Sequence, residues 1–181
     1  MKFIPVILII LGYFFANPVQ AQNQTCTLTF DVIAGNALGT IRPGEHLTGK
    51  VEFSTARSWY QDKETLSYFS NGKISVTHHD KGTVRAHVRV VHVVRTPYTA
   101  DYISIDANHA EGNLGGEKSY EDPMLITFYS KPGTLTTFDL PRTNEDWNRL
   151  SKRRFFQVHT PDAMSTFYGD FNNVIGKCPS Q

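Results

Sequence analysis

A valine-rich segment with charged residues at alternate positions, Thr83 to Arg95 (TVRAHVRVVHVVR), is the longest run of β-branched residues in the sequence. One face of the segment has Arg85, His87 and Arg89. The other face has the apolar residues Val84, Ala86, Val88, Val90 and Val94. This period-two alternation predicts a β-strand with one buried face and one solvated face. Every other strand of the domain is expected to pair with this strand or to pack on it.

The segment is too long for a regular strand, because its residues would span roughly 43 Å at about 3.3 Å each when fully extended. Two adjacent valines, Val90 and Val91, break the alternation. We expect a β-bulge at this step, which turns Val91 and Val93 inward and His92 outward.

The first 21 residues have the three-part layout of a secretory signal peptide. Lys2 precedes an apolar run from Phe3 to Phe15, and Ala21 ends a short polar stretch. The run is shorter than the roughly 20 residues that a membrane-spanning helix needs. We therefore expect a signal peptide over residues 1–21 and a secreted or periplasmic protein without a membrane span. The alternative is an uncleaved anchor formed by the same run.

Residues 22–181 are expected to form a single domain. Their length, about 160 residues, is enough for one hydrophobic core, and no repeat or shift of composition divides them. One of the 18 basic residues is Lys2, so the mature chain carries 17, equal to its 17 acidic residues. A balanced charge gives no general attraction to nucleic acid, which is therefore not an expected partner.

The two cysteines of the chain, Cys26 and Cys178, lie near the two ends of this domain. In an oxidising compartment such an isolated pair is expected to form a disulfide. The Cα atoms of a disulfide lie roughly 5.5–6 Å apart, so the first and last strands must be neighbours, side by side or face to face. The alternative is two unrelated buried thiols.

Alternating segments separated by Gly, Pro and Asn fill the rest of the domain. The expected strands are residues 26–33, 47–53, 66–69, 73–79, 83–95, 100–106, 124–130, 135–140, 153–160 and 166–175. Asn71-Gly72 predicts a hairpin between two of these strands, and Lys131-Pro132-Gly133 predicts a hairpin between two others. Residues 54–63 are an expected loop.

Thr143, followed by Glu145 and Asp146, has the pattern of a helix N-cap with an acidic first turn. It predicts one short helix over about residues 144–151. With nine or ten strands and at most this one helix, the expected fold class is all-β. We expect a two-sheet antiparallel sandwich whose termini are joined by a disulfide, in preference to a barrel.

The cationic face of the valine-rich strand is the candidate binding site. Arg85, His87 and Arg89 are expected to project side by side at intervals of roughly 7 Å. Arginine guanidinium groups bind carboxylate, phosphate or sulfate through paired hydrogen bonds. The candidate partner is therefore an anionic glycan or another component of the cell envelope.

The same face also has a purely structural interpretation. In that case it is a solvated surface whose charges pair with acidic residues of the next strand, such as Asp101 and Asp106. A second basic cluster, Lys152-Arg153-Arg154, offers the same binding chemistry elsewhere in the chain.

No motif for nucleophilic or metal-dependent catalysis is present in the sequence. It lacks G-x-S-x-G and H-E-x-x-H, and both cysteines are expected to be bonded. His78 and His79 precede Asp80, but adjacent residues of a strand point to opposite faces, so no metal site is expected there. No catalytic residue, metal or cofactor is therefore assigned.

The expected function is that of a non-enzymatic, exported interaction module, whose ligand the sequence does not name. One alternative is a secreted hydrolase that uses an Asp/His pair, and another is a small-ligand carrier with a hollow β-fold. A deep pocket with converging His and carboxylate groups favours the enzyme, and a large apolar cavity favours the carrier. A filled core with surface grooves favours the interaction module.

Four segments of strand and turn cover most of the domain: LTGKVEF, TLSYFSNGKISV, LITFYSKPGTLTTFDLP and FYGDFNNV. They resemble segments of uncharacterised exported β-sandwich proteins of bacteria, of the kind associated with a PEP-CTERM sorting tail. The resemblance implies export and a sandwich, and it carries over no catalytic residue. The sequence ends at Gln181 without a Pro-Glu-Pro motif, an apolar helix or a basic tail, so the resemblance does not imply that kind of anchoring.

Overall fold

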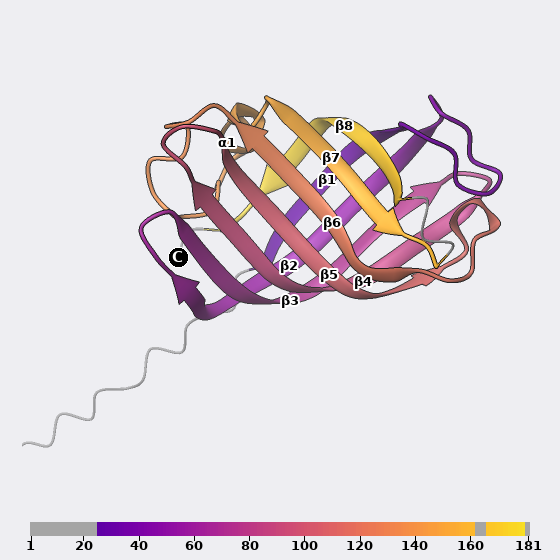
Figure 1. Ribbon diagram of the computed structural model, residues 1–181, viewed down its shortest axis with the longest axis horizontal. Coiled ribbons are helices and arrows are strands. Elements are labelled where there is room, and N and C mark those ends of the chain that lie inside the picture. The colour runs from indigo at the N-terminus through magenta and orange to yellow at the C-terminus, as the bar shows by residue number, and fades with distance from the viewer. Residues whose placement is uncertain (1–24, 162–165, 180–181) are drawn as a thin grey trace, which may run out of the picture.

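The computed structural model of the protein describes residues 25–161 and 166–179, and the predicted signal peptide lies outside them. Within these residues, eight antiparallel strands form a closed barrel in which each strand pairs with the next and the last pairs with the first (Figure 1). The strands are β1 (Thr25–Ala34), β2 (His46–Gln61), β3 (Thr65–His78), β4 (Gly82–Arg95), β5 (Asp101–Gly112), β6 (Glu121–Ser130), β7 (Arg153–His159) and β8 (Thr166–Lys177). In the same part of the chain, no helix has the length and apolar character needed to cross a membrane.

The closed barrel shows that the predicted two-sheet sandwich is wrong. The sequence predicts more strands than the eight of the barrel, partly because Asn71-Gly72 is not a hairpin turn. It belongs to a bulge within the continuous strand β3, which pairs with β4 through Phe69 and Val90 on one side of the bulge and through Gly72 and Val88 on the other. A Cβ atom at Gly72 would overlap the backbone of β2, so the glycine is needed for close strand approach rather than for a turn.

Two further predicted boundaries are also wrong. Residues 54–63 were expected to be a loop, but β2 continues to Gln61 with two irregularities in its pairing with β3. Residues 135–140 were expected to be a strand, but they belong to an irregular connection between β6 and β7. There the amide N–H of Leu135 donates to the carboxylate of Asp101 at 2.8 Å. The carboxylate of Asp101 thus takes the place of the backbone carbonyl that a neighbouring strand would have offered to Leu135.

The valine-rich segment forms β4 and contains the predicted bulge. The register between β4 and β5 shifts directly before Val90, at Arg89, which is close to the predicted step. Val91 and Val93 are fully buried, and His92 faces outward with 27% of its side chain exposed. The inward and outward assignments made from the sequence are therefore confirmed on the C-terminal side of the bulge.

Side chains fill the interior of the barrel. The fully buried ones come from all eight strands and include Leu28, Val51, Phe53, Ile74, Val76, Val84, Val91, Ile103, Ile105, Ile126, Phe128, Phe156, Val158 and Phe167. A side chain that borders a space large enough for water retains some accessible surface, and these side chains have none. They pack as the continuous core expected of a small barrel.

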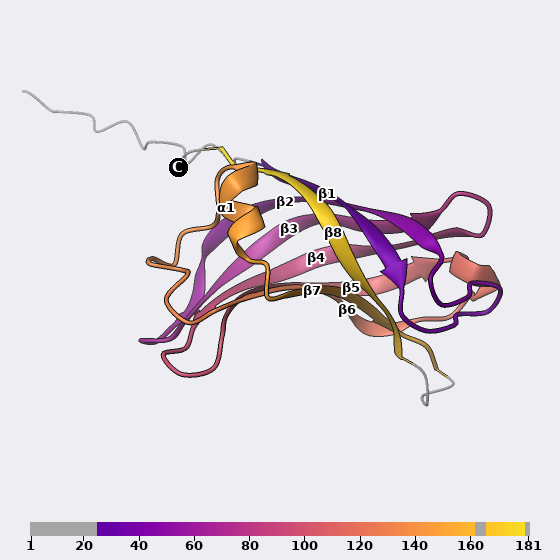
Figure 2. The ribbon, with the colours of Figure 1, turned by 90° about the horizontal axis from the view of Figure 1, so that it is seen from above.

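The two ends of the barrel are closed in different ways (Figure 2). At one end, the helix α1 (Asn144–Arg149) places the fully buried ring of Trp147 on Phe128, with 4.9 Å between the ring centroids. At the other end lies the short 3₁₀ helix η1 (Leu114–Gly116), where the carbonyl oxygen of Gly115 accepts from the amide of Thr40 in the β1–β2 connection. Both ends are thus covered by segments that connect consecutive strands, α1 between β6 and β7 and η1 between β5 and β6.

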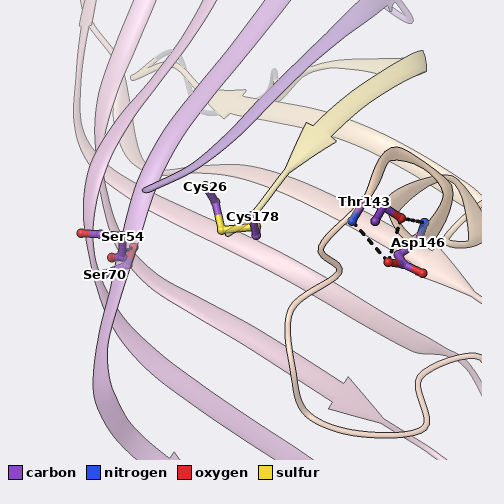
Figure 3. The surroundings of a disulfide bond; sticks show 6 residues. All are labelled: Cys26, Ser54, Ser70, Thr143, Asp146 and Cys178. Carbon is purple, nitrogen blue, oxygen red and sulfur yellow. Dashed lines mark hydrogen bonds between the residues drawn. A yellow bond between two sulfur atoms is a disulfide. The ribbon is translucent and has the colours of Figure 1, made fainter. Parts of the chain in front are cut away.

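The start of α1 and the disulfide agree with the sequence predictions (Figure 3). Thr143 is the N-cap of the helix, and its side chain and that of Asp146 bond reciprocally to each other's backbone amides. Cys26 of β1 is bonded to Cys178, which follows β8, with Cα atoms 4.2 Å apart. Because β1 and β8 also pair as neighbouring strands, the disulfide joins the seam at which the barrel closes.

Tyr120 holds the connection after η1 against the barrel. Its ring packs on the core, and its hydroxyl donates to the carbonyl oxygen of Glu117 at 3.0 Å. Burial raises the pKa of Tyr120 to about 12 from 10.0. Since the unfolded chain releases this proton first, the stability contributed by Tyr120 is complete below about pH 10 and is lost as the pH rises towards 12.

We expect the stability of the Tyr120→Phe variant to decrease less with rising pH than that of the unaltered protein. The measurement is the thermal midpoint of unfolding between about pH 9 and pH 11, where the tyrosines of the unfolded state begin to ionise. The control is Tyr98→Phe, because Tyr98 is 92% exposed and its replacement should not change the slope. A slope for Tyr120→Phe equal to that of the unaltered protein would contradict the prediction.

Candidate functional site

A groove on the outer face of strands β2 to β5 gathers charged side chains from four neighbouring strands. Its volume is about 380 Å³. It is lined by Lys50, Glu52, Lys73, Ile74, Ser75, Arg85, Ala86, His87, His109 and Glu111. The apolar residues among them belong to the inward-facing set, so the polar side chains form the walls.

The register of the sheet explains why these side chains meet. From β2 towards β5, they form the rows Lys50–Ser75–Arg85–Glu111 and Glu52–Lys73–His87. Neighbouring strands lie about 4.8 Å apart, so residues within a row are adjacent on the outer surface. Ser75 is the small residue of its row, and the long side chains of Lys50 and Arg85 on either side leave a hollow above it.

The groove carries an excess of positive charge. Three cationic and two acidic side chains line it, so its formal charge is +1 when the histidines are neutral. Lys50 Nζ lies 2.7 Å from the carboxylate of Glu52, and this hydrogen bond, together with the nearby charges of Lys50 and Lys73, lowers the pKa of Glu52. Among the described residues, neither Lys73 nor Arg85 has a hydrogen-bond or ion-pair partner for its side chain. These two cations are available to an anion.

Two of the three residues predicted for the cationic stripe lie in the groove. Arg85 and His87 line it, whereas Arg89 lies outside it at the bulge of β4. Arg89 is exposed, and its Nη1 lies 3.2 Å from the side-chain oxygen of Asn108 when that amide is oriented to satisfy both of its hydrogen bonds. The bulge therefore divides the predicted stripe into two parts.

The acidic residues considered as partners of the stripe have other roles. Asp101 is 1% exposed and accepts from the backbone near the end of the barrel that α1 covers. The carboxylate of Asp106 lies 3.5 Å from His92 Nε2. Neither Asp101 nor Asp106 therefore pairs with the stripe, and the acidic residue of the next strand that lies opposite Arg85 is Glu111.

Lys50, Lys73 and Ser75 were not among the predicted site residues. The alternation within residues 47–53 and 73–79 already indicates that these side chains point outward. Their convergence with Arg85, however, depends on how β2, β3 and β4 are aligned. Alternation acts within a single strand, whereas the groove is formed by side chains from several strands, so the sequence pattern did not identify it.

The second basic cluster predicted as an anion site is held by internal partners. Arg153 Nε lies 3.4 Å from the carboxylate of Asp170. Arg154 Nε donates to the carbonyl oxygen of Leu150 at 2.7 Å, and burial lowers the pKa of Arg154. These two arginines are therefore less available to a ligand than Lys73 and Arg85 of the groove.

A Ser–His–Asp arrangement, which sequence analysis did not find, lies further along the outer face of β3 to β5. Ser67 Oγ is 2.8 Å from His92 Nδ1, and His92 Nε2 is 3.5 Å from the carboxylate of Asp106. These are the residue types of a serine hydrolase relay. Ser67 is only 2% exposed, however, so a substrate carbonyl does not reach its oxygen. The arrangement is a polar link across three strands.

His78 and His79 do not point to opposite faces as predicted. Their rings stack with centroids 4.6 Å apart, because His79 lies beyond the end of β3, where strand alternation no longer applies. His78 Nε2 lies 3.5 Å from the carboxylate of Glu45, and His79 pairs with Asp80 at 2.6 Å. In the described ranges, no group of three or more His, Cys, Asp or Glu residues is placed to hold a metal ion.

Comparison of the chain with protein-family models, curated proteins and solved structures finds no match. The resemblance to exported bacterial proteins associated with PEP-CTERM tails therefore stays a prediction.

Proposed function

We propose that this protein is an exported, non-enzymatic binding domain whose groove over β2 to β5 holds an anionic ligand. The observation that carries the proposal is that Lys73 and Arg85 line a concave surface without a hydrogen-bond or ion-pair partner in the described part of the chain. Lys73 and Arg85 are diagonal neighbours on adjacent strands, and free ammonium and guanidinium groups suit carboxylate, phosphate or sulfate.

Other observations favour this function over the alternatives. The filled interior supports a site on the outer surface rather than a carrier cavity. The burial of Ser67 supports binding rather than hydrolysis. The disulfide is compatible with export, since such bonds persist mainly in oxidising compartments. The signal peptide predicted over residues 1–21 supports the same location.

Binding of tripolyphosphate, a compact polyanion, tests the groove. We expect the combined substitutions Lys73→Ala and Arg85→Ala to lower the affinity at least about tenfold, because each hydrogen bond to a charged group contributes roughly 1.5 kcal/mol or more. Isothermal titration calorimetry at low ionic strength measures this change, since exposed charges are screened by salt.

The matched control for this experiment is Lys131→Ala combined with Lys177→Ala. It removes the same net charge from exposed positions outside the groove, and the affinity should stay within about twofold of that of the unaltered protein. Equal losses in the two double variants would indicate general charge attraction and contradict the proposal. Absence of tripolyphosphate binding to the unaltered protein would contradict it as well.

A further inference from the structure

An exposed aromatic pair, Trp59 of β2 and Phe69 of β3, lies on the outer surface of the barrel. The two ring centroids are 5.6 Å apart, and the residues are 57% and 39% exposed. Their rings pack on each other rather than into the core, so a large apolar area stays in contact with water. Other large apolar side chains are exposed as well, but here two aromatic rings lie in contact with each other, and contiguous exposed apolar surface is a feature of binding sites. We call Trp59 and Phe69 the aromatic platform.

The aromatic platform and the groove lie on the same outer face, one after the other along β3. Phe69, Lys73 and Ser75 of β3 are all on the outward side, and from Phe69 to Ser75 the strand covers about 20 Å. Phe69 pairs with Val90, and Gly72 pairs with Val88. The exposed Arg89 therefore lies on β4 between the level of the platform and the level of the groove. The order along the surface is therefore aromatic rings, one arginine, and the cationic groove.

We infer that the ligand of the groove is an acidic polysaccharide that lies along β3 and β4, with an anionic group in the groove and a sugar ring on the aromatic platform. This inference rests on the proposed function. The apolar C–H face of a sugar ring packs on aromatic side chains, and its carboxylate or sulfate group pairs with arginine and lysine. An acidic polysaccharide presents both kinds of group along one extended chain.

The separation of the two features favours this ligand over other anions. A compact anion in the groove is too small to reach Trp59. A polypeptide of acidic residues alone, such as polyglutamate, supplies charges at intervals but has no ring to stack on the platform. Only a ligand with charges and rings in the same chain uses the free cations Lys73 and Arg85 together with the exposed aromatic pair.

Calorimetric titration with two oligosaccharides of equal length tests the inference: oligogalacturonate, which carries carboxylates, and a sulfated cello-oligosaccharide, which carries sulfates. We expect at least one of them to bind, and its identity distinguishes the two anionic groups. Trp59→Ala with Phe69→Ala should lower that affinity about tenfold and leave the affinity for tripolyphosphate unchanged. Lys73→Ala with Arg85→Ala should lower both affinities.

The control is Tyr98→Ala, which removes an aromatic residue that is 92% exposed in the β4–β5 turn and should change neither affinity. Oligosaccharide affinities that do not depend on the aromatic platform would overturn the inference, as would binding of polyglutamate of the same length with equal affinity. If tripolyphosphate still requires Lys73 and Arg85 in those cases, the proposed function stands and only the polysaccharide assignment fails. If tripolyphosphate does not bind, the proposed function itself fails.

Discussion

Replacement of both Cys26 and Cys178 by serine is expected to lower the free energy of unfolding by about 2–5 kcal/mol. The two cysteines are separated by 152 positions in the sequence, so the disulfide closes a loop that contains nearly all of the described chain. In the chain-entropy model, a loop of this length restricts the unfolded state by roughly 5 kcal/mol, which is an upper figure. Urea denaturation followed by far-ultraviolet circular dichroism measures the loss.

Reduction of the unaltered protein distinguishes the effect of the covalent bond on stability from the effect of the packing of the two residues, both of which are buried. A reductant should bring its urea midpoint close to that of the double serine variant, and it should have no effect on the variant. The ladder between β1 and β8 remains in both proteins, so a folded barrel is still expected. A loss of less than about 1 kcal/mol would contradict a disulfide that restricts the unfolded chain.

Features that depend on neighbouring residues could be predicted from the sequence. The valines of β4 alternate until Val90-Val91, and the bulge lies next to that step. Thr143 followed by Asp146 indicated a helix start, and these two residues form the capping box. In each case the physical cause, a strand period or a local hydrogen bond, lies within a few residues of the signal.

Closure of the sheet could not be predicted in the same way. Asn71-Gly72 favours a hairpin when it is considered alone, and only the close approach of β2 makes Gly72 part of a bulge. The barrel closes because residues such as Thr27 and Lys177 pair across the whole length of the domain. Strand alternation is the same in a sandwich and in a barrel, so the pattern by itself did not separate them.

The candidate site was predictable only in part, for the same reason. Arg85 and His87 belong to one strand, and their common face follows from alternation. Lys73 and Ser75 join them through the register of β3 with β4, and a shift of one residue would place different side chains there. The exposed position of Trp59 likewise depends on the extension of β2, which the sequence did not indicate.

Trp147→Ala is expected to lower the free energy of unfolding by about 3–5 kcal/mol, the range for removal of a large buried aromatic side chain. Trp147 is fully buried, and its ring contacts Phe128. A Cβ atom at Gly176 would overlap this ring, which shows how closely β8 packs on it. The truncation therefore leaves a cavity where α1 closes the barrel, and the surrounding strands can fill it only in part.

Trp147→Phe separates the loss of packing from the loss of a polar group. Trp147 Nε1 is buried, and within the described residues it has no hydrogen-bond partner, a situation that costs roughly 1–3 kcal/mol. Phenylalanine keeps a ring against Phe128 and removes this N–H, so we expect a clearly smaller loss than for alanine. Trp59→Ala is the matched control, because Trp59 is 57% exposed and its truncation should change the stability by less than about 0.5 kcal/mol. Urea denaturation that gives similar losses for Trp147→Ala and Trp59→Ala would contradict a role of α1 in closing the core.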